Sequence, residues 1–170
     1  GAYTVTLLDN VLHAAGPNEE NAVDPTAAIS YTITDADGSP VTGNTLTITL
    51  DDDAPTAVSG PALVVAETAA ATGGTNLLAN DAQGADGAVV THVKLPGAAD
   101  FVAITSGVQG PAGTYSHTVT GLGTYTFQAN GDWTFDPLSP QVGATTDASF
   151  TYRITDGDGD TSEAAQTVTI

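Results

Sequence analysis

Apolar residues at every second position, with threonine or serine between them, mark several short segments of this chain. In one of them Ile29, Tyr31 and Ile33 alternate with polar side chains. This period of two is typical of a β-strand with one buried face and one face in water. The same pattern predicts strands at residues 3–7, 46–50, 63–66, 125–127, 133–135, 150–154 and 168–170.

Residues that favour turns separate these segments. The pair Asn130-Gly131 lies between two predicted strands and is the strongest short signal for a β-hairpin. Two alanine-rich stretches, 14–28 and 66–75, contain Gly, Pro or Thr and keep no period of 3.6 residues, so they do not predict helices. Many short strands joined by Gly, Pro and Asp turns indicate an all-β fold of the sandwich type.

An internal repeat divides the chain. Residues 29–38 (ISYTITDADG) match residues 150–159 (FTYRITDGDG) at a spacing of 121 positions, and residues 1–4 match 123–126 with a slip of one residue. We therefore predict that residues 1–53 form the C-terminal half of one sandwich module and residues 54–170 a complete one. Pro55 follows the acidic run at the join, where proline ends a strand and stiffens a linker.

Half a sandwich has an open edge and an incomplete core. Three arrangements would complete residues 1–53. Further chain upstream could supply the missing strands, or the half-module could pack on the second module within one larger domain. Alternatively, a ligand-binding module inserted upstream could split the domain.

The charge balance is strongly acidic. Twenty aspartates and glutamates stand against Lys94 and Arg153, for a formal net charge of −18. Nucleic acid and anionic membrane surfaces both need a basic face, so we exclude them as partners. No apolar run approaches the roughly 20 residues that cross a membrane, so we expect no membrane insertion. The chain has no cysteine, so it has no disulfide.

The acidic residues gather in turns. Asp156, Asp158 and Asp160 alternate in a glycine-containing turn, as Asp35 and Asp37 do, and Asp51, Asp52 and Asp53 follow a predicted strand. Two charges about 5 Å apart repel by roughly 3 kcal/mol at an effective dielectric constant of about 20. Ca²⁺ is a hard cation that takes six to eight oxygen ligands, so it would relieve this repulsion.

We therefore predict Ca²⁺ as a cofactor. Its predicted ligands are Asp35, Asp37, Asp51, Asp52, Asp53, Glu67, Asp81, Asp156, Asp158 and Asp160. The competing interpretation is that Asp and Gly are simply good turn residues. The site is not an EF-hand, because the sixth and twelfth positions counted from Asp156 are Thr161 and Thr167 instead of Gly and Glu.

Catalytic patterns are weak. His13, His92 and His117 are scattered without zinc-ligand spacing, and the chain has no Gly-x-Ser-x-Gly motif. Trp133 could stack on a sugar, but it alternates with Phe135, which favours a place in the core. We predict that the chain is not an enzyme.

Several motifs occur in an order that is similar to one family. They are residues 31–38 (YTITDADG), 45–55 (TLTITLDDDAP), 76–81 (NLLAND), 84–87 (GADG), 123–127 (GTYTF), 130–135 (NGDWTF) and 156–161 (DGDGDT). In this order they resemble the tandem extender repeats of type I-secreted RTX adhesins, which overlap in pattern with VCBS and cadherin-like bacterial repeats.

The resemblance implies Ig-like sandwiches whose linkers and loops bind Ca²⁺, in proteins that hold bacteria to surfaces. It implies an extracellular place at the bacterial cell surface, a monomeric chain, and neighbouring repeats of the same polypeptide as partners. A surface glycan or peptide would then be bound through an adjacent module. The alternative is that this region is itself a Ca²⁺-dependent module that binds a sugar or a peptide.

Overall fold

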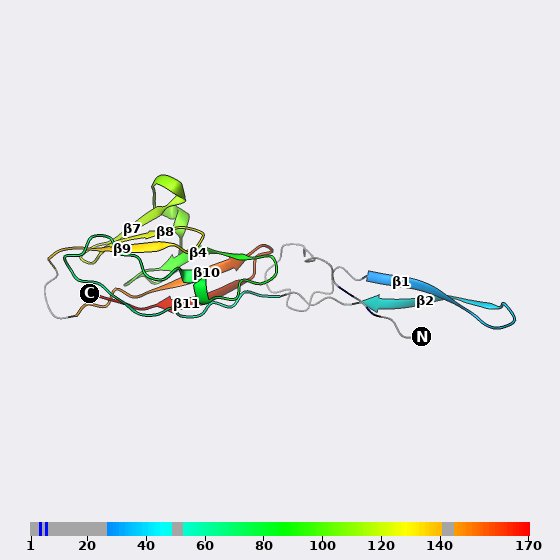
Figure 1. Ribbon diagram of the computed structural model, residues 1–170. Coiled ribbons are helices and arrows are strands. Elements are labelled where there is room, and N and C mark those ends of the chain that lie inside the picture. The colour runs from blue at the N-terminus through cyan, green and yellow to red at the C-terminus, as the bar shows by residue number, and fades with distance from the viewer. Residues whose placement is uncertain (1–3, 5, 7–26, 49–52, 141–144) are drawn as a thin grey trace.

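The structure is a computed structural model that describes residues 4, 6, 27–48, 53–140 and 145–170. Residues 53–140 and 145–170 form a β-sandwich, and residues 27–48 form a two-stranded hairpin that stands apart from it (Figure 1). No helix among these residues is long and apolar enough to cross a membrane. The protein is therefore all-β in its described part, with an Ig-like sandwich as its main body.

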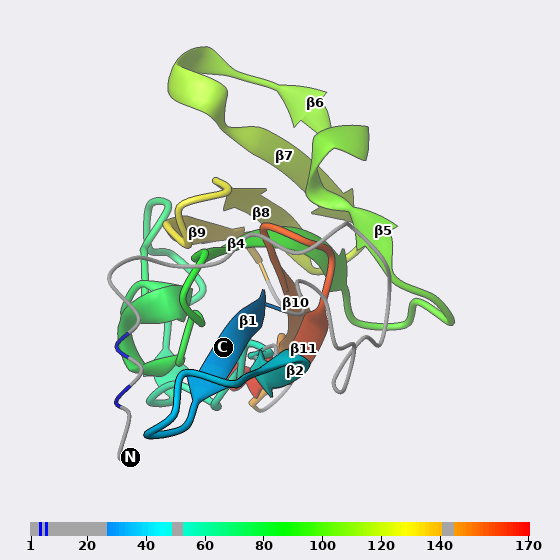
Figure 2. The same ribbon diagram turned by 90° about the vertical axis from the view of Figure 1, so that its right-hand side faces the viewer.

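Two antiparallel sheets make the sandwich (Figure 2). The first has the order β11 (Thr161–Gln166), β10 (Phe150–Asp156), β4 (Ala88–Lys94), β5 (Val102–Ala103). The second has the order β6 (Val108–Gln109), β7 (Tyr115–Val119), β8 (Gly123–Phe127), β9 (Trp133–Pro137). β3 (Leu63–Val64) pairs in parallel with β12 (Val168–Thr169). The short 3₁₀ helices η1 (Leu77–Asn80), η2 (Ile104–Ser106) and η3 (Pro111–Gly113) lie in the connections.

Aromatic side chains from both sheets fill the space between them. The ring of Phe150 on β10 meets three rings of the second sheet edge to face, with centroids 5.7 Å from Tyr125, 5.2 Å from Phe127 and 5.0 Å from Trp133. Such contacts add about 0.5–1.5 kcal/mol each to the burial of the rings. The predicted core position of Trp133 is confirmed, because only 4% of this residue is exposed.

The β8–β9 hairpin forms where Asn130-Gly131 predicts it. The amide of Gln128 donates to the carbonyl of Asp132 at 2.9 Å, and Gly131 adopts a φ of +88°, which glycine tolerates. The strands predicted at residues 63–66, 125–127, 133–135, 150–154 and 168–170 are present as β3, β8, β9, β10 and β12. The first predicted strand, residues 3–7, lies almost wholly outside the described residues.

The hairpin consists of β1 (Ala27–Thr34) and β2 (Pro40–Ile48), paired antiparallel. Its turn reproduces that between β10 and β11. The amide of Ser39 donates to Asp35 Oδ1 at 2.9 Å, as the amide of Asp160 donates to Asp156 Oδ1 at 2.7 Å. The internal repeat is therefore present in the structure as well as in the sequence.

Candidate metal centre

The turn between β10 and β11 concentrates carboxylates at one end of the sandwich. Asp156 Oδ1 accepts hydrogen bonds from the amides of Gly159 at 3.0 Å and Asp160 at 2.7 Å. Gly159 adopts a φ of +116°, which lets the chain curl back in this way. Because the turn closes on Asp156, the alternating aspartates are held close together.

A third carboxylate comes from a loop far away in the sequence. Asp86 lies two residues before β4, and β4 pairs antiparallel with β10 so that Ala88 is opposite Asp156. One oxygen each of Asp86, Asp156 and Asp158 lies within 4.8 Å of the others. A methyl group added at Gly157 would lie 2.4 Å from Asp86 Oδ2, so glycine is needed for this approach.

The same loop contacts the linker. Asp53 Oδ2 accepts a hydrogen bond of 2.7 Å from the amide of Ala85. A methyl group added at Gly84 would lie 2.8 Å from Asp53 Oδ2 and 3.7 Å from Asp86 Oδ1, so both carboxylates border this glycine. Three segments with acidic residues, the linker, the loop before β4 and the β10–β11 turn, therefore meet at the end of the sandwich that leads to the linker (Figure 1).

The electrostatics of the cluster disfavour several negative charges. Burial, together with the hydrogen bond and the charge of Asp158, raises the pKa of Asp156 to about 6. Asp156 Oδ2 is buried and accepts no hydrogen bond from the described residues. Asp158 Oδ1 and Asp160 Oδ2 are also shielded from solvent. Buried carboxylate oxygens of this kind are costly unless protons or a cation compensate them.

Neither basic residue of the chain supplies that cation. The Arg153 guanidinium is bound to Glu163 at 2.7 Å and lies 4.4 Å from the centre of the Phe101 ring. Lys94 is at the opposite end of β4 from Asp86. The atoms that the cluster offers to a metal are all carboxylate oxygens. These are hard ligands, which Ca²⁺ and Mg²⁺ prefer, so the residues present fit a hard divalent ion.

The other predicted ligands lie elsewhere. Asp35 and Asp37 are exposed in the β1–β2 turn, where hydrogen bonds with Asp35 and Ser39 lower the pKa of Asp37. Glu67 is exposed in a turn after β3. Asp51 and Asp52 lie outside the described residues. Asp160, only 7% exposed, follows the cluster in the same turn.

Asp81 has a different environment. Its Oδ1 accepts hydrogen bonds from the amide of Val58 at 2.7 Å and from the Tyr152 hydroxyl at 3.0 Å. Burial raises the pKa of Asp81 while these hydrogen bonds oppose the rise. Its contacts tie the segment after the linker to β10, so Asp81 has a structural explanation without a metal.

Sequence reasoning missed Asp86. The only sequence feature that pointed to Asp86 was the segment Gly84–Gly87, in which two glycines flank a single acidic residue. Its position beside Asp156 depends on the pairing of β4 with β10, and β4 was not among the predicted strands. Of the ten predicted ligands, Asp156 and Asp158 share the described cluster.

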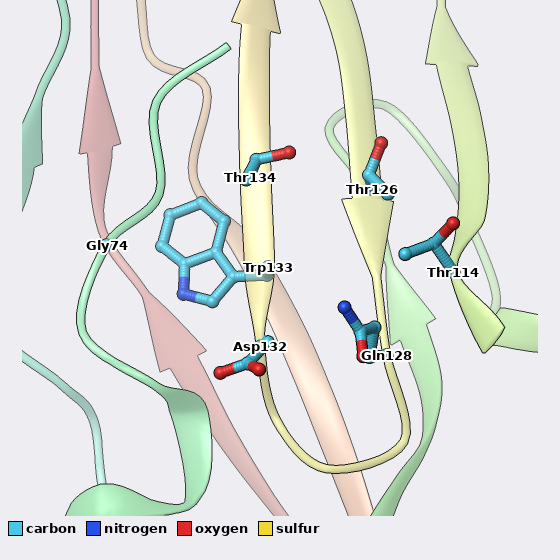
Figure 3. A pocket seen from close by; sticks show the side chains of 7 residues that line it. All are labelled: Gly74, Thr114, Thr126, Gln128, Asp132, Trp133 and Thr134. Carbon is cyan, nitrogen blue, oxygen red and sulfur yellow. The ribbon is translucent and has the colours of Figure 1, made fainter. Parts of the chain in front are cut away.

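A separate pocket of about 390 Å³ lies against β8 and β9, lined by Gly74, Thr114, Thr126, Gln128, Asp132, Trp133 and Thr134 (Figure 3). The Trp133 indole points toward Gly74, away from the side of β9 that carries Thr134 (Figure 3). Its Nε1 donates to the carbonyl of Thr75 at 3.0 Å. The pocket therefore offers hydroxyl, amide and carboxylate groups without an exposed aromatic face on which a sugar could stack.

The two described histidines have local partners. His92 Nδ1 lies 3.0 Å from Thr91 Oγ1, and His117 Nε2 lies 2.8 Å from the carbonyl oxygen of Ile104. His92 lies on β4 and His117 on β7, so both contacts are local contacts of strand residues.

The model of a family described as bacterial Ig domain matches residues 52–170. A search of curated proteins finds no match. Domains of the matched family are typically non-enzymatic and are typically found at the surface or outside the cell.

Proposed function

Since the chain belongs to the bacterial Ig domain family, we propose that it is a calcium-stabilised extender of a type I-secreted RTX adhesin. It would project a ligand-binding module away from the bacterial cell, with neighbouring repeats of the same polypeptide as its partners. The observation that supports this proposal is the convergence of Asp86, Asp156 and Asp158, together with the burial of Asp156 Oδ2 without a hydrogen bond from the described residues.

Asp86, Asp156 and Asp158 would hold the ion. Further carboxylates are Asp53, which borders Gly84, and Asp160, which lies in the β10–β11 turn. Ca²⁺ accepts six to eight oxygens in flexible geometry, whereas Mg²⁺ demands a nearly ideal octahedron, so a site assembled from several loops favours Ca²⁺. The bound ion would supply the positive charge that the cluster needs. The residues themselves connect the β10–β11 turn to the loop before β4.

The mechanical consequence concerns the linker. Asp53 is bound to the amide of Ala85, one residue from Asp86. An ion that fixes Asp86 would therefore also fix the loop that contacts the linker. The connection between modules would thereby become stiffer, which is the property that an extender needs to hold its tip away from the cell.

The proposal predicts that calcium stabilises the sandwich through Asp86. For a ligand that binds only the folded state, a concentration of 100 times the Kd adds about 2.7 kcal/mol to the free energy of unfolding. Calorimetric melts with excess Ca²⁺ or with EGTA should therefore differ by roughly 5–10 °C in Tm. The Asp86→Asn variant should lose most of this difference.

Asp136→Asn is the matched control, because Asp136 is exposed on β9 and lies outside the cluster. It should keep the full response to calcium. Metal analysis of the purified protein should return bound calcium for the parent chain and for this control. Identical melts of the parent chain in Ca²⁺ and EGTA would contradict the proposal.

A further inference from the structure

The outer face of the β11–β10–β4 sheet carries both basic side chains of this acidic chain. In the register of the three strands, Thr151 of β10 lies opposite Lys94 of β4 and opposite Ala165 of β11. Residues opposite one another in a sheet share a face. Arg153 follows two positions later on β10, and the residues on either side of Thr151 are buried, so Thr151 and Arg153 point away from the core.

The two cations differ in their surroundings. The Arg153 guanidinium is bound to Glu163 at 2.7 Å and lies over the ring of Phe101, so its charge is already engaged. Within the part of the chain that the structure describes, the Lys94 ammonium has no ion pair and the Thr151 hydroxyl has no hydrogen bond. A positive charge and a hydroxyl group therefore lie on neighbouring strands with their bonding capacity unused.

A pocket of about 240 Å³ opens at this place. Its lining includes Lys94, Leu95 and Ala98 on one side and Thr151 and Ala165 beneath. The loop after β4 forms the side wall, because the amide of Ala98 donates to the carbonyl of Leu95 at 3.0 Å and closes a tight turn. The volume is below the roughly 300–1,000 Å³ of sites for drug-sized ligands, so the pocket suits a single small ring.

The pocket is remote from the acidic cluster. Lys94 is the last residue of β4, whereas Ala88, which lies opposite Asp156, is the first. Seven residues at about 3.4 Å each span roughly 20 Å, more than twice the Debye length of about 8 Å at physiological ionic strength. Asp100 and Asp147 are near in the sequence, but neither is among the described residues that line the pocket. A single carboxylate can therefore approach Lys94, while a long polyanion would also meet the acidic surfaces.

We propose that this pocket binds a hexuronate, a sugar ring that carries one carboxylate. The Lys94 ammonium donates to the carboxylate, and the Thr151 hydroxyl bonds to a hydroxyl group of the ring. The carbons of Leu95, Ala98 and Ala165 contact the C–H groups of the ring. A hydrogen bond to a charged group is about twice as strong as a neutral one, so the carboxylate sets the specificity. The inference does not depend on calcium or on the extender function.

An NMR titration of the ¹⁵N-labelled chain with sodium glucuronate at constant ionic strength tests the proposal. For a ligand of about 13 non-hydrogen atoms, the amide shifts should saturate with a Kd on the order of 1 mM. The shifts should be confined to residues 94–98, 149–151 and 165. Glucose has a similar ring without the charge and should bind about ten times more weakly or less. No saturable shift at these residues, or equal affinity for glucose, would overturn the proposal.

N-acetylglutamate distinguishes a sugar acid from an acidic peptide. It offers a carboxylate but no ring hydroxyl groups, so it should bind more weakly than glucuronate. An equal or higher affinity for N-acetylglutamate would overturn the assignment to a sugar and identify an acidic side chain as the ligand.

Variants locate the carboxylate. Lys94→Gln should weaken the binding of glucuronate about tenfold or more. Thr151→Val keeps a β-branched residue in β10 and should also weaken it, because the hydroxyl is lost. Arg153→Gln is the matched control: it makes the same change in net charge on the same face, but Arg153 is not among the described residues of the lining, so binding should be kept. Spectra that are unchanged away from the pocket show that each variant is folded. Undiminished binding by Lys94→Gln, or an equal loss in Arg153→Gln, would overturn the proposal.

Discussion

At Asp156 two requirements oppose each other. The fold buries one carboxyl oxygen, which favours the protonated form, while a metal ion would need the charged form. The pKa of about 6, against an ordinary value of 3.8, means that the folded state holds this proton more tightly than the unfolded state does. A raised carboxyl pKa contributes stability that is fully present below pH 3.8 and is lost as the pH rises through 6.

We therefore predict opposite pH dependences with and without calcium. In EGTA, this contribution to the free energy of unfolding should fall as the pH rises from about 4 to 6. In excess calcium, the stabilisation by the ion should grow over the same range, because protons no longer compete for the carboxylates. Thermal melts at pH 4.5, 5.5 and 7 measure both trends.

The Asp156→Asn variant provides the control for these profiles, because asparagine does not titrate. The pH dependence of the free energy of unfolding should become flatter in this variant than in the parent chain, both in EGTA and in excess calcium. If the variant and the parent keep the same profiles, Asp156 is not the residue whose titration links pH to stability.

Among the secondary-structure elements, the sequence predicts the strands whose two faces differ most in polarity. β8 and β10 alternate buried aromatic or aliphatic residues with threonine or arginine, so their period of two is plain. β4 is less regular because a bulge shifts its register opposite Arg153 and Ile154, which puts the buried Val90 and Val93 three positions apart. The residues of β7 are partly buried or exposed, so its sequence (YSHTV) shows no clear alternation of apolar and polar side chains.

The candidate site was predicted only in part for the same reason: one of its residues depends on a strand that the sequence pattern does not predict. The aspartates of the β10–β11 turn are local in sequence, and their alternation could be read directly. Asp86 reaches them only because β4 lies beside β10, a pairing between segments about 70 residues apart. No local pattern contains that information. A site assembled from several loops is therefore predictable only as far as the strand order is known.

The repeated β-hairpins offer a matched test of burial. Ile154 on β10 is fully buried, whereas its counterpart Ile33 on β1 is 54% exposed. Truncation of a buried isoleucine to alanine costs about 2–5 kcal/mol, while most surface substitutions stay within about 0.5 kcal/mol. Ile154→Ala should therefore lower the free energy of unfolding strongly and Ile33→Ala hardly at all, as measured by urea denaturation.

Across the whole molecule, the net charge of −18 makes every acidic cluster a source of repulsion. Monovalent salt screens such repulsion without regard to position, with a Debye length of about 8 Å at physiological ionic strength. A bound divalent ion would act instead at one place, the end of the sandwich where Asp53 and Asp86 border Gly84. A bound ion that stiffens the linker therefore differs from screening salt in acting at one defined place in the molecule.

This difference can be measured as a distance distribution. The chain has no cysteine, so Thr45→Cys on β2 and Thr118→Cys on β7, both exposed positions, accept one spin label each. With calcium, the distribution of distances between the two labels should become narrower than in EGTA, because the fixed loop holds the linker through Asp53. Potassium chloride at matched ionic strength should leave the distribution broad, and Asp53→Asn should weaken the effect of calcium. Equal widths in calcium and EGTA would mean that the ion, even where it binds, does not control the linker, and the extender would then owe its stiffness to packing between modules.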